Sequence, residues 1–272
     1  LRFLYLHRNQ FDGSIPSTIG NLTKLNTLHL CYNKLSGSIP SNLSNLTDLW
    51  INDTQIDYNA LYTNDSILIA FLDSKDPDWA ETQTIAPEGV TATATSQTSV
   101  EISWTPITYT GDTGGYRIYY SETSDGPYTF FDQTVDKTVS SMEVTGLNSS
   151  TLYYFVVQTR TEPHSDQQNQ NDSEYSAEVS EYTMVNISGT ITCGGSPLEG
   201  VVLSGFPGSP ATNGSGEYSA DVPYNWTGTV SPVLAGYSFT PPAAVYVNVT
   251  ADQITNYTAT LNTHTISGTI TY

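Results

Sequence analysis

The sequence predicts a mostly β protein, in which a short repeat solenoid with a C-terminal cap helix is followed by two antiparallel β-sandwiches in series. Three observations predict this architecture: a repeated pattern in residues 1–47, alternating strand patterns between residues 87 and 183, and a segment at residues 187–192 that recurs at residues 266–271. The 19 tyrosines also favour β-structure, because aromatic residues fit pleated, half-buried surfaces.

The repeat is visible when residues 1–23 are aligned with residues 25–47. The second copy follows the pattern L-x-x-L-x-L-x-x-N-x-L-x-G-x-I-P in full, and the first copy follows it with Phe11 in place of the leucine at the eleventh position. We expect the leucines at the fourth and sixth positions to point inward from short stacked strands. Asn9 and Asn33 would then satisfy buried backbone groups of the turns. The pattern resembles a leucine-rich repeat of the kind found in plant receptors and bacterial surface proteins.

A third, degenerate copy covers residues 51–61, which align with residues 25–35 of the second copy. Residues 65–72 then predict a short amphipathic helix, which residues 73–79 terminate. A solenoid must close its core with an atypical end, so we assign residues 1–81 to leucine-rich repeats plus a C-terminal cap. Leu1 enters in mid-solenoid, and we expect either more chain upstream or another surface to cover the first repeat.

Between residues 82 and 184, strands are expected over 100–104, 115–120 and 142–147, with Pro87 and Val90 opening the first strand and residues 174–176 opening the last. This spacing resembles that of a fibronectin type III domain. The resemblance implies a core role for Trp104. It also makes Tyr153 the corner tyrosine, whose hydroxyl would bond to backbone. An Arg-Gly-Asp motif is absent.

After residues 187–192, the chain continues with residues 194–203 and 212–219, where Asn213-Gly214 and Ser215-Gly216 predict a tight turn before a strand. This pattern makes residues 185–262 similar to carboxypeptidase-regulatory-like and Cna-B-type prealbumin-like sandwiches. Residues 187–192 recur identically as residues 266–271, so residues 263–272 are expected to form the first strand of a further repeat. Some Cna-B-type domains carry a Lys–Asn isopeptide bond, which this domain excludes because it has no lysine.

The net charge of −19 argues against two classes of partner. An acidic surface repels phosphate backbones and anionic lipid, so we expect no nucleic-acid binding. No apolar run approaches the length of roughly 18 residues that a membrane-spanning helix needs, so we expect no membrane insertion within this segment. Cys31 and Cys193 fall in different predicted domains and are expected to be free thiols.

We predict no catalytic residues, no metal site and no cofactors, because no known catalytic, metal-binding or phosphate-binding motif is present. Cys31 near His7 or His29 could be drawn as a nucleophile–base pair, but assorted polar residues are normal at exposed repeat positions. The acidic sets Asp73/Asp76/Asp78 and Asp166/Asp172/Glu174 could hold Ca²⁺, although neither spacing matches a known loop.

A protein or glycan ligand, if one binds here, is expected on the concave face of the repeats. The exposed repeat columns carry the candidate ligand-binding residues Tyr5, His7, Arg8, His29, Tyr32, Gln55, Asp57 and Tyr58. Asn-x-Ser/Thr sequons, possible glycosylation sites of an exported protein, start at Asn21, Asn42, Asn45, Asn52, Asn64, Asn148, Asn171, Asn186, Asn213, Asn225, Asn248 and Asn256.

The leading hypothesis is a non-catalytic, extracellular or cell-surface binding or scaffold segment of an adhesin-like protein. Its domain mix resembles bacterial multidomain surface proteins. A second hypothesis is a subunit of an extracellular filament that binds copies of itself through an open solenoid end and an orphan terminal strand. A third is an accessory region of a larger secreted enzyme.

Overall fold

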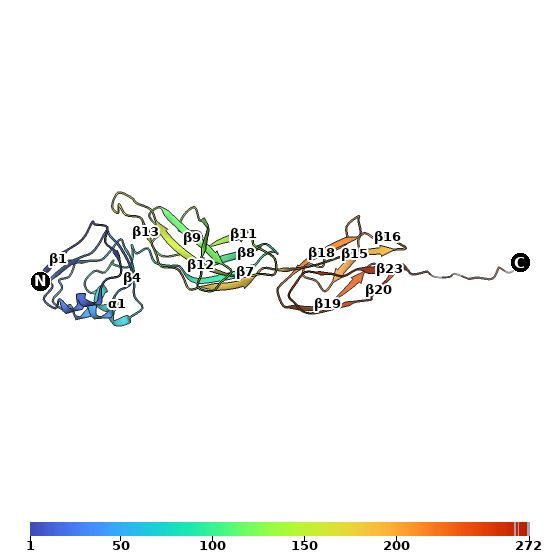
Figure 1. The fold of residues 1–272 in the computed structure, drawn as a ribbon, viewed down its shortest axis with the longest axis horizontal. Coiled ribbons are helices and arrows are strands. Elements are labelled where there is room, and N and C mark those ends of the chain that lie inside the picture. The colour runs from blue at the N-terminus through green and yellow to red at the C-terminus, as the bar shows by residue number, and fades with distance from the viewer. Residues whose placement is uncertain (264, 266, 271–272) are drawn as a thin grey trace. The chain divides into compact units, whose positions relative to one another are not determined.

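A computed structural model describes residues 1–263, 265 and 267–270 (Figure 1). Its contacts divide the chain into two compact units. Unit 1 comprises Leu1–Ala92, Glu101–Glu143 and Tyr153–Ser180, and unit 2 comprises Thr93–Val100, Val144–Leu152 and Glu181–Tyr272. Unit 1 therefore holds the repeats and most of the middle domain.

The repeats stack through parallel strands. The sheet has the order β1-β3-β5, from β1 (Phe3–Tyr5), β3 (Thr27–His29) and β5 (Thr54–Gln55). Leu4 lies beside Leu28, and Leu28 beside Thr54, so the register reproduces the alignment of the three copies in the sequence. The other elements of the repeats are η1 (Ser17–Asn21), η2 (Ser41–Asn45) and the parallel strands β2 (Asp12–Gly13), β4 (Lys34–Ser38) and β6 (Ala60–Tyr62).

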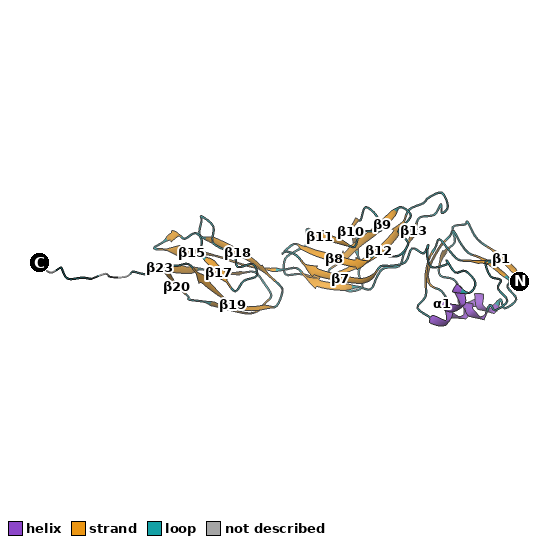
Figure 2. Ribbon diagram, turned by 180° about the vertical axis from the view of Figure 1, so that it is seen from behind, coloured by secondary structure: helices purple, strands orange, loops and turns teal. Residues whose placement is uncertain are grey.

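The helix expected after the third repeat is α1 (Ser66–Asp73), drawn in purple in Figure 2. It begins where the Asp65 side chain accepts hydrogen bonds from the backbone N–H groups of Ile67 and Leu68, which otherwise have no partner within the helix. Its Leu68 and Leu72 are fully buried and join the core of the repeats. Burial of each such side chain contributes about 2 kcal/mol.

The middle domain contains two sheets, with the orders β10-β9-β12-β13 and β11-β8-β7; β14 pairs with β12. The expected core residue Trp104 is buried, and its ring lies 5.1 Å from that of Tyr116. Tyr153 is also buried, and its hydroxyl donates to the Glu122 carboxylate at 3.1 Å. The strands are β7 (Glu88–Ala94), β8 (Ser99–Thr105), β9 (Gly114–Ser121), β10 (Thr129–Gln133), β11 (Ser141–Thr145), β12 (Leu152–Thr161), β13 (Asn171–Asp172) and β14 (Val179–Tyr182).

The last strand does not open at residues 174–176 as expected; it begins at Val179. Ahead of Val179, serine side chains take the place of some of the regular backbone hydrogen bonds between strands. Ser173 donates its N–H to the Thr159 carbonyl, while its hydroxyl accepts from the Thr159 N–H. Ser176 does the same with Val157. The edge is therefore bonded through side chains, which local strand patterns do not reveal.

The third domain lies in unit 2 and also has two sheets. One has the order β16-β15-β23-β20, with β18 and β22 paired to β15, and the other has the order β17-β19-β21. Ile187 and Ile191 of β15, in the recurring segment, are fully buried. The strands are β15 (Val185–Cys193), β16 (Ser196–Pro197), β17 (Val202–Ser204), β18 (Glu217–Val222), β19 (Trp226–Val233), β20 (Tyr237–Thr240), β21 (Ala244–Val249), β22 (Gln253–Ile254) and β23 (Tyr257–Leu261).

The expected strand at residues 263–272 is only partly covered by the structure. His264, Ile266, Thr271 and Tyr272 lie outside the described residues, and residues 267–270 are not in a strand.

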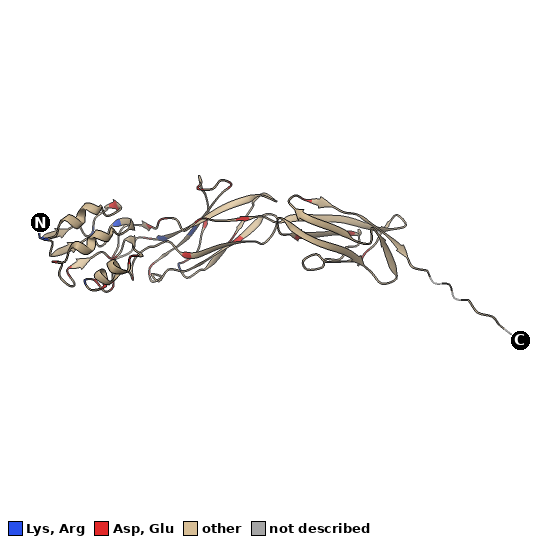
Figure 3. Cartoon of the chain, turned by 90° about the horizontal axis from the view of Figure 1, so that it is seen from below, with Lys and Arg blue, Asp and Glu red and all other residues tan. Residues whose placement is uncertain are grey.

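All eight Lys and Arg residues belong to unit 1, whereas acidic residues occur in both units (Figure 3). Cys31 and Cys193 are free. Within the described part of the chain, we find no helix with the length and apolarity needed to span a bilayer.

Candidate binding face

Asparagine side chains tie each repeat to the next. Asn33, which is fully buried, donates to the Leu6 and Leu30 carbonyls and accepts from the Phe11 N–H at 3.1 Å. Asn59 repeats this pattern one repeat later, accepting from the Leu35 N–H. The amides satisfy buried backbone groups that would otherwise each cost about 1–3 kcal/mol.

Gln83 continues this asparagine series, although the sequence analysis missed it. It follows Asn59 at the same interval that separates Asn9 from Asn33, and it is 2% exposed. Its amide donates to the Ile56 carbonyl at 2.9 Å and accepts from the Leu61 N–H at 2.9 Å. The regular spacing of the asparagines indicates this position once glutamine is accepted in place of asparagine.

Two further side chains bond to the segment directly after β5. Asp76 Oδ2 accepts from the Ile56 N–H at 3.3 Å, and Thr82 Oγ1 accepts from the Tyr58 N–H at 3.0 Å. In the preceding repeat, the Gln55 and Asp57 carbonyls accept the equivalent bonds from Leu30 and Tyr32. Side chains of residues 76–83 thus replace the backbone of a fourth repeat.

The polar loop at residues 162–170, together with Asn171 of β13, bonds to the repeats within unit 1. Gln167 Nε2 donates to the carbonyls of Asn33 and Tyr58 at 3.0 and 2.7 Å. Asn169 Nδ2 donates to the Asn9 carbonyl at 2.7 Å, and Asn171 Nδ2 to the Tyr58 carbonyl at 3.3 Å. Amides at every second position therefore bond to three successive repeats, a role the sequence did not reveal.

The eight predicted ligand-binding residues separate into different environments. Arg8, Tyr32 and Tyr58 occupy equivalent turns, all with positive φ of 52–58°. The Tyr32 and Tyr58 rings stack at 4.7 Å, and the Arg8 guanidinium lies 4.4 Å from the Tyr32 centroid. Tyr58 continues the column toward Tyr109 and His164 of the middle domain, so its ring already has partners.

Tyr5, His7 and His29 do come together, on the side of the β1-β3-β5 sheet opposite the buried leucines. The His29 ring lies 5.1 Å from Tyr5 and 5.5 Å from His7. We define the ladder face by these residues and their exposed neighbours: Phe3, Tyr5, His7, His29, Trp50 and Asp53. Phe3, Tyr5 and Trp50 are 47%, 57% and 51% exposed.

The ladder face contains a buried polar atom that lacks a hydrogen-bond partner in the described part of the chain, His29 Nε2. Its nearest charged atom is Asp53 Oδ1, at 4.0 Å. Burial and the neighbouring His7 lower the pKa of His29, although Asp53 opposes the shift. Because this nitrogen is buried, the groups of the ladder face that a partner can contact directly are the exposed rings of Phe3, Tyr5 and Trp50.

Cys31, Gln55 and Asp57 lie farther along the same sheet. Burial, followed by the negative Asp57, raises the pKa of the Cys31 thiol to about 12, and its Sγ lies 3.6 Å from Gln55 Oε1. A thiol with so high a pKa is a poor nucleophile, which argues against the Cys/His pair. Asp57 forms a hydrogen bond with Asp76.

Four of the six acidic residues considered for Ca²⁺ have other partners. Asp73 accepts from the Trp79 indole at 3.0 Å, Asp76 from the Ile56 N–H, and Asp172 pairs with Arg160 at 2.7 Å. Glu174 accepts from the Tyr62 hydroxyl. No group of three potential ligands with metal-binding geometry occurs in the described residues.

The sequons differ in accessibility. Asn171 is 3% exposed and its amide is bonded to the repeats, so the folded chain would not present it to a glycosyltransferase. Asn42 and Asn186 are half-buried, with amides bonded to Ser17 and Ser219. The exposed sequons start at Asn21, Asn45, Asn52, Asn64, Asn148, Asn213, Asn225, Asn248 and Asn256.

Family models match two parts of the chain. The leucine-rich repeat model matches residues 1–22 and 24–46, and the fibronectin type III domain model matches residues 85–182. The chain contains leucine-rich repeats and a fibronectin type III domain. Both are typical protein-binding or scaffold modules and are typically non-catalytic. A search of curated proteins gives no match.

Several solved structures are similar to part of the chain. An Fn3-like protein from Clostridium thermocellum is 24% identical over 35% of this chain and 91% of its own, with a TM-score of 0.28. A structure described as a myokine is 25% identical over 37% of this chain and 98% of its own, with a TM-score of 0.30. The fn3 domain of human contactin 1 is 17% identical over 36% of this chain and 76% of its own, with a TM-score of 0.30.

Proposed function

We propose that the chain is a non-catalytic, extracellular or cell-surface binding segment of an adhesin-like protein, and that the ladder face binds a protein partner. The observation that carries the proposal is the set of exposed aromatic rings on this face, those of Phe3, Tyr5 and Trp50. Aromatic residues are enriched at protein interfaces, and tryptophan and tyrosine are among the residues that contribute most to binding energy there.

The support behind this face is consistent with a binding role. Buried asparagines fix the repeats from inside, and the amides at positions 167, 169 and 171 bond to them from the middle domain. A surface held in its bound geometry loses less entropy on association. We further infer that residues 1–81 form leucine-rich repeats plus a C-terminal cap, and that residues 185–262 form a carboxypeptidase-regulatory-like or prealbumin-like sandwich.

The test is binding of the purified chain to surface proteins of its source cells, with the captured protein identified and then purified. Trp50→Ser and Tyr5→Ser should each weaken binding to that protein by about tenfold or more. Phe130→Ser is the matched control, because Phe130 is 45% exposed but lies on β10. Equal losses in all three variants, or no loss in the ladder-face variants, would reject the ladder face as the site.

A further inference from the structure

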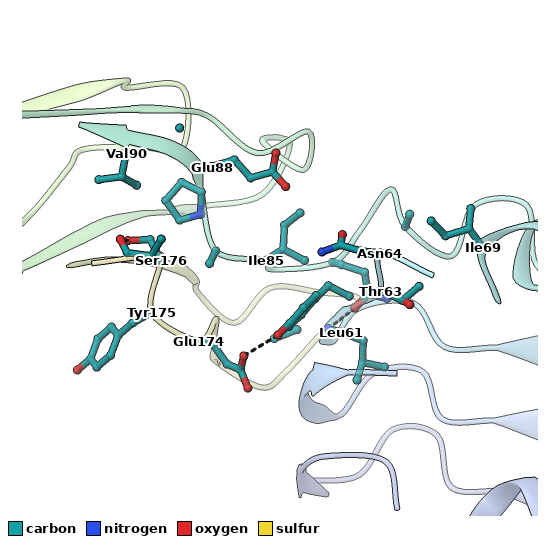
Figure 4. A pocket seen from close by; sticks show the side chains of 18 of the residues that line it. Leu61, Thr63, Asn64, Ile69, Ile85, Glu88, Val90, Glu174, Tyr175 and Ser176 are labelled. Atoms are coloured by element: carbon teal, nitrogen blue, oxygen red, sulfur yellow. Dashed lines mark hydrogen bonds between the residues drawn. The ribbon is translucent and has the colours of Figure 1, made fainter. Parts of the chain in front are cut away.

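A second site lies away from the ladder face, where the end of the repeats meets the middle domain within unit 1. It is a cavity of about 670 Å³, lined by β6, α1, the segment before β7 and residues 174–177 (Figure 4). Its volume falls in the range of about 300–1,000 Å³ that is typical of ligand sites.

The cavity combines an apolar lining with carboxylates. Leu61, Ile85 and Val90 are among its apolar residues, and Asp73, Glu88 and Glu174 contribute carboxylates. Figure 4 shows Glu88 and Glu174 on either side of Ile85. None of the described residues that line it is Lys, Arg or His, so the cavity has no cation of its own.

The three carboxylates differ in how far they are already satisfied. Asp73 accepts from the Trp79 indole, and Glu174 Oε2 accepts from the Tyr62 hydroxyl at 3.1 Å. Glu88 is exposed, and its side chain has no hydrogen-bond or ion-pair partner in the described part of the chain. Its carboxylate is therefore free to pair with a ligand.

From this charge complementarity we propose that the cavity binds a basic peptide segment of a partner protein, in which an arginine is flanked by aliphatic residues. The long stem of arginine packs on apolar surface while its guanidinium reaches a carboxylate, and a carboxylate pairs with it through two parallel hydrogen bonds. Glu88 is the ion-pair partner, and the partly exposed Ile85 and Val90 receive the aliphatic groups. Acidic ligands are repelled by the same lining.

The experiment uses the full chain and a fluorescein-labelled pentapeptide, Gly-Leu-Arg-Leu-Gly, with fluorescence polarisation as the readout. A twin peptide carries citrulline in place of arginine, which keeps the shape and removes the charge. We expect the arginine peptide to bind with a Kd of about 0.1 mM and the citrulline peptide at least tenfold more weakly.

Glu88→Gln should weaken binding of the arginine peptide about tenfold. Glu101→Gln is the matched control, because Glu101 is also an exposed strand glutamate but does not line the cavity. Equal losses in both variants would show unspecific attraction to a chain of net charge −19 and overturn the proposal. Equal binding of the two peptides, or none at about 1 mM, would also overturn it.

Failure here is distinguishable from failure of the ladder face. Trp50→Ser leaves the cavity lining intact, so it should retain full binding of the arginine peptide.

Discussion

Asp57 and Asp76 hydrogen-bond to each other beside the buried end of β5. Burial, followed by the neighbouring Asp57 charge, raises the pKa of Asp76 from 3.8 to about 7. A group whose pKa is raised on folding binds its proton more tightly in the folded state. Its contribution to stability is therefore complete below about pH 4 and is lost as the pH rises through 7.

Replacing Asp57 with asparagine should relieve this repulsion while retaining a hydrogen-bonding side chain. We expect Asp57→Asn to raise the unfolding midpoint at pH 8 by roughly 2–4 °C and to have a smaller effect at pH 5. Thermal unfolding followed by circular dichroism at both pH values measures this. The exposed Asp12→Asn is the control, and an equal shift at both pH values would contradict the coupling.

The elements of the repeats depend on side chains that replace missing backbone partners, and Gln83 shows this most directly. Its amide bonds to Ile56, Leu61 and Trp79 in a buried position. Removing the amide would leave these backbone groups without their bonds to Gln83, and each buried unpaired group costs about 1–3 kcal/mol.

Gln83→Ala should therefore lower the free energy of unfolding of unit 1 by about 3 kcal/mol. Urea denaturation gives this value, with the exposed Gln10→Ala as the matched control. A loss below about 0.5 kcal/mol is the level of an ordinary surface substitution. It would mean that the hydrogen bonds of Gln83 do not stabilise the end of the repeats.

Elements with a local signal could be predicted from the sequence. The repeat register and the helix after Asp65 both follow from patterns within a few residues. The start of the last strand in the middle domain could not, because Ser173 and Ser176 take part in its edge through side-chain hydroxyls. Their bonding partners lie in β12, distant in sequence.

At the scale of the whole molecule, the bonds from the polar loop and β13 to the repeats make unit 1 a cooperative body. Lys137, 1% exposed, adds to this: its ammonium donates to Thr161 Oγ1, which hydrogen-bonds with Thr84 Oγ1 in the segment after the repeats. Cooperative units form where buried contacts are continuous. We expect the repeats and the middle domain to unfold together.

Gln167→Ala combined with Asn169→Ala should separate these transitions. Calorimetry of the full chain should then show an earlier transition for the repeats, and hydrogen exchange in residues 1–62 should become about tenfold faster or more. Gln97→Ala is the control, because Gln97 bonds to Asp221 inside unit 2. Unchanged exchange in residues 1–62 would show that the amides do not hold the repeats.

The sequence by itself determined the repeat period, the inward leucines, the fibronectin-like strands and the absence of Lys and Arg after residue 160. These features are local or periodic, because burial imposes a fixed spacing on each element. The tertiary structure decided which exposed residues share a surface: it joined Tyr5, His7 and His29, but placed Tyr58 against His164, which is distant in sequence. It also formed the cavity of Glu88 and Glu174, since such contacts depend on how separate elements pack.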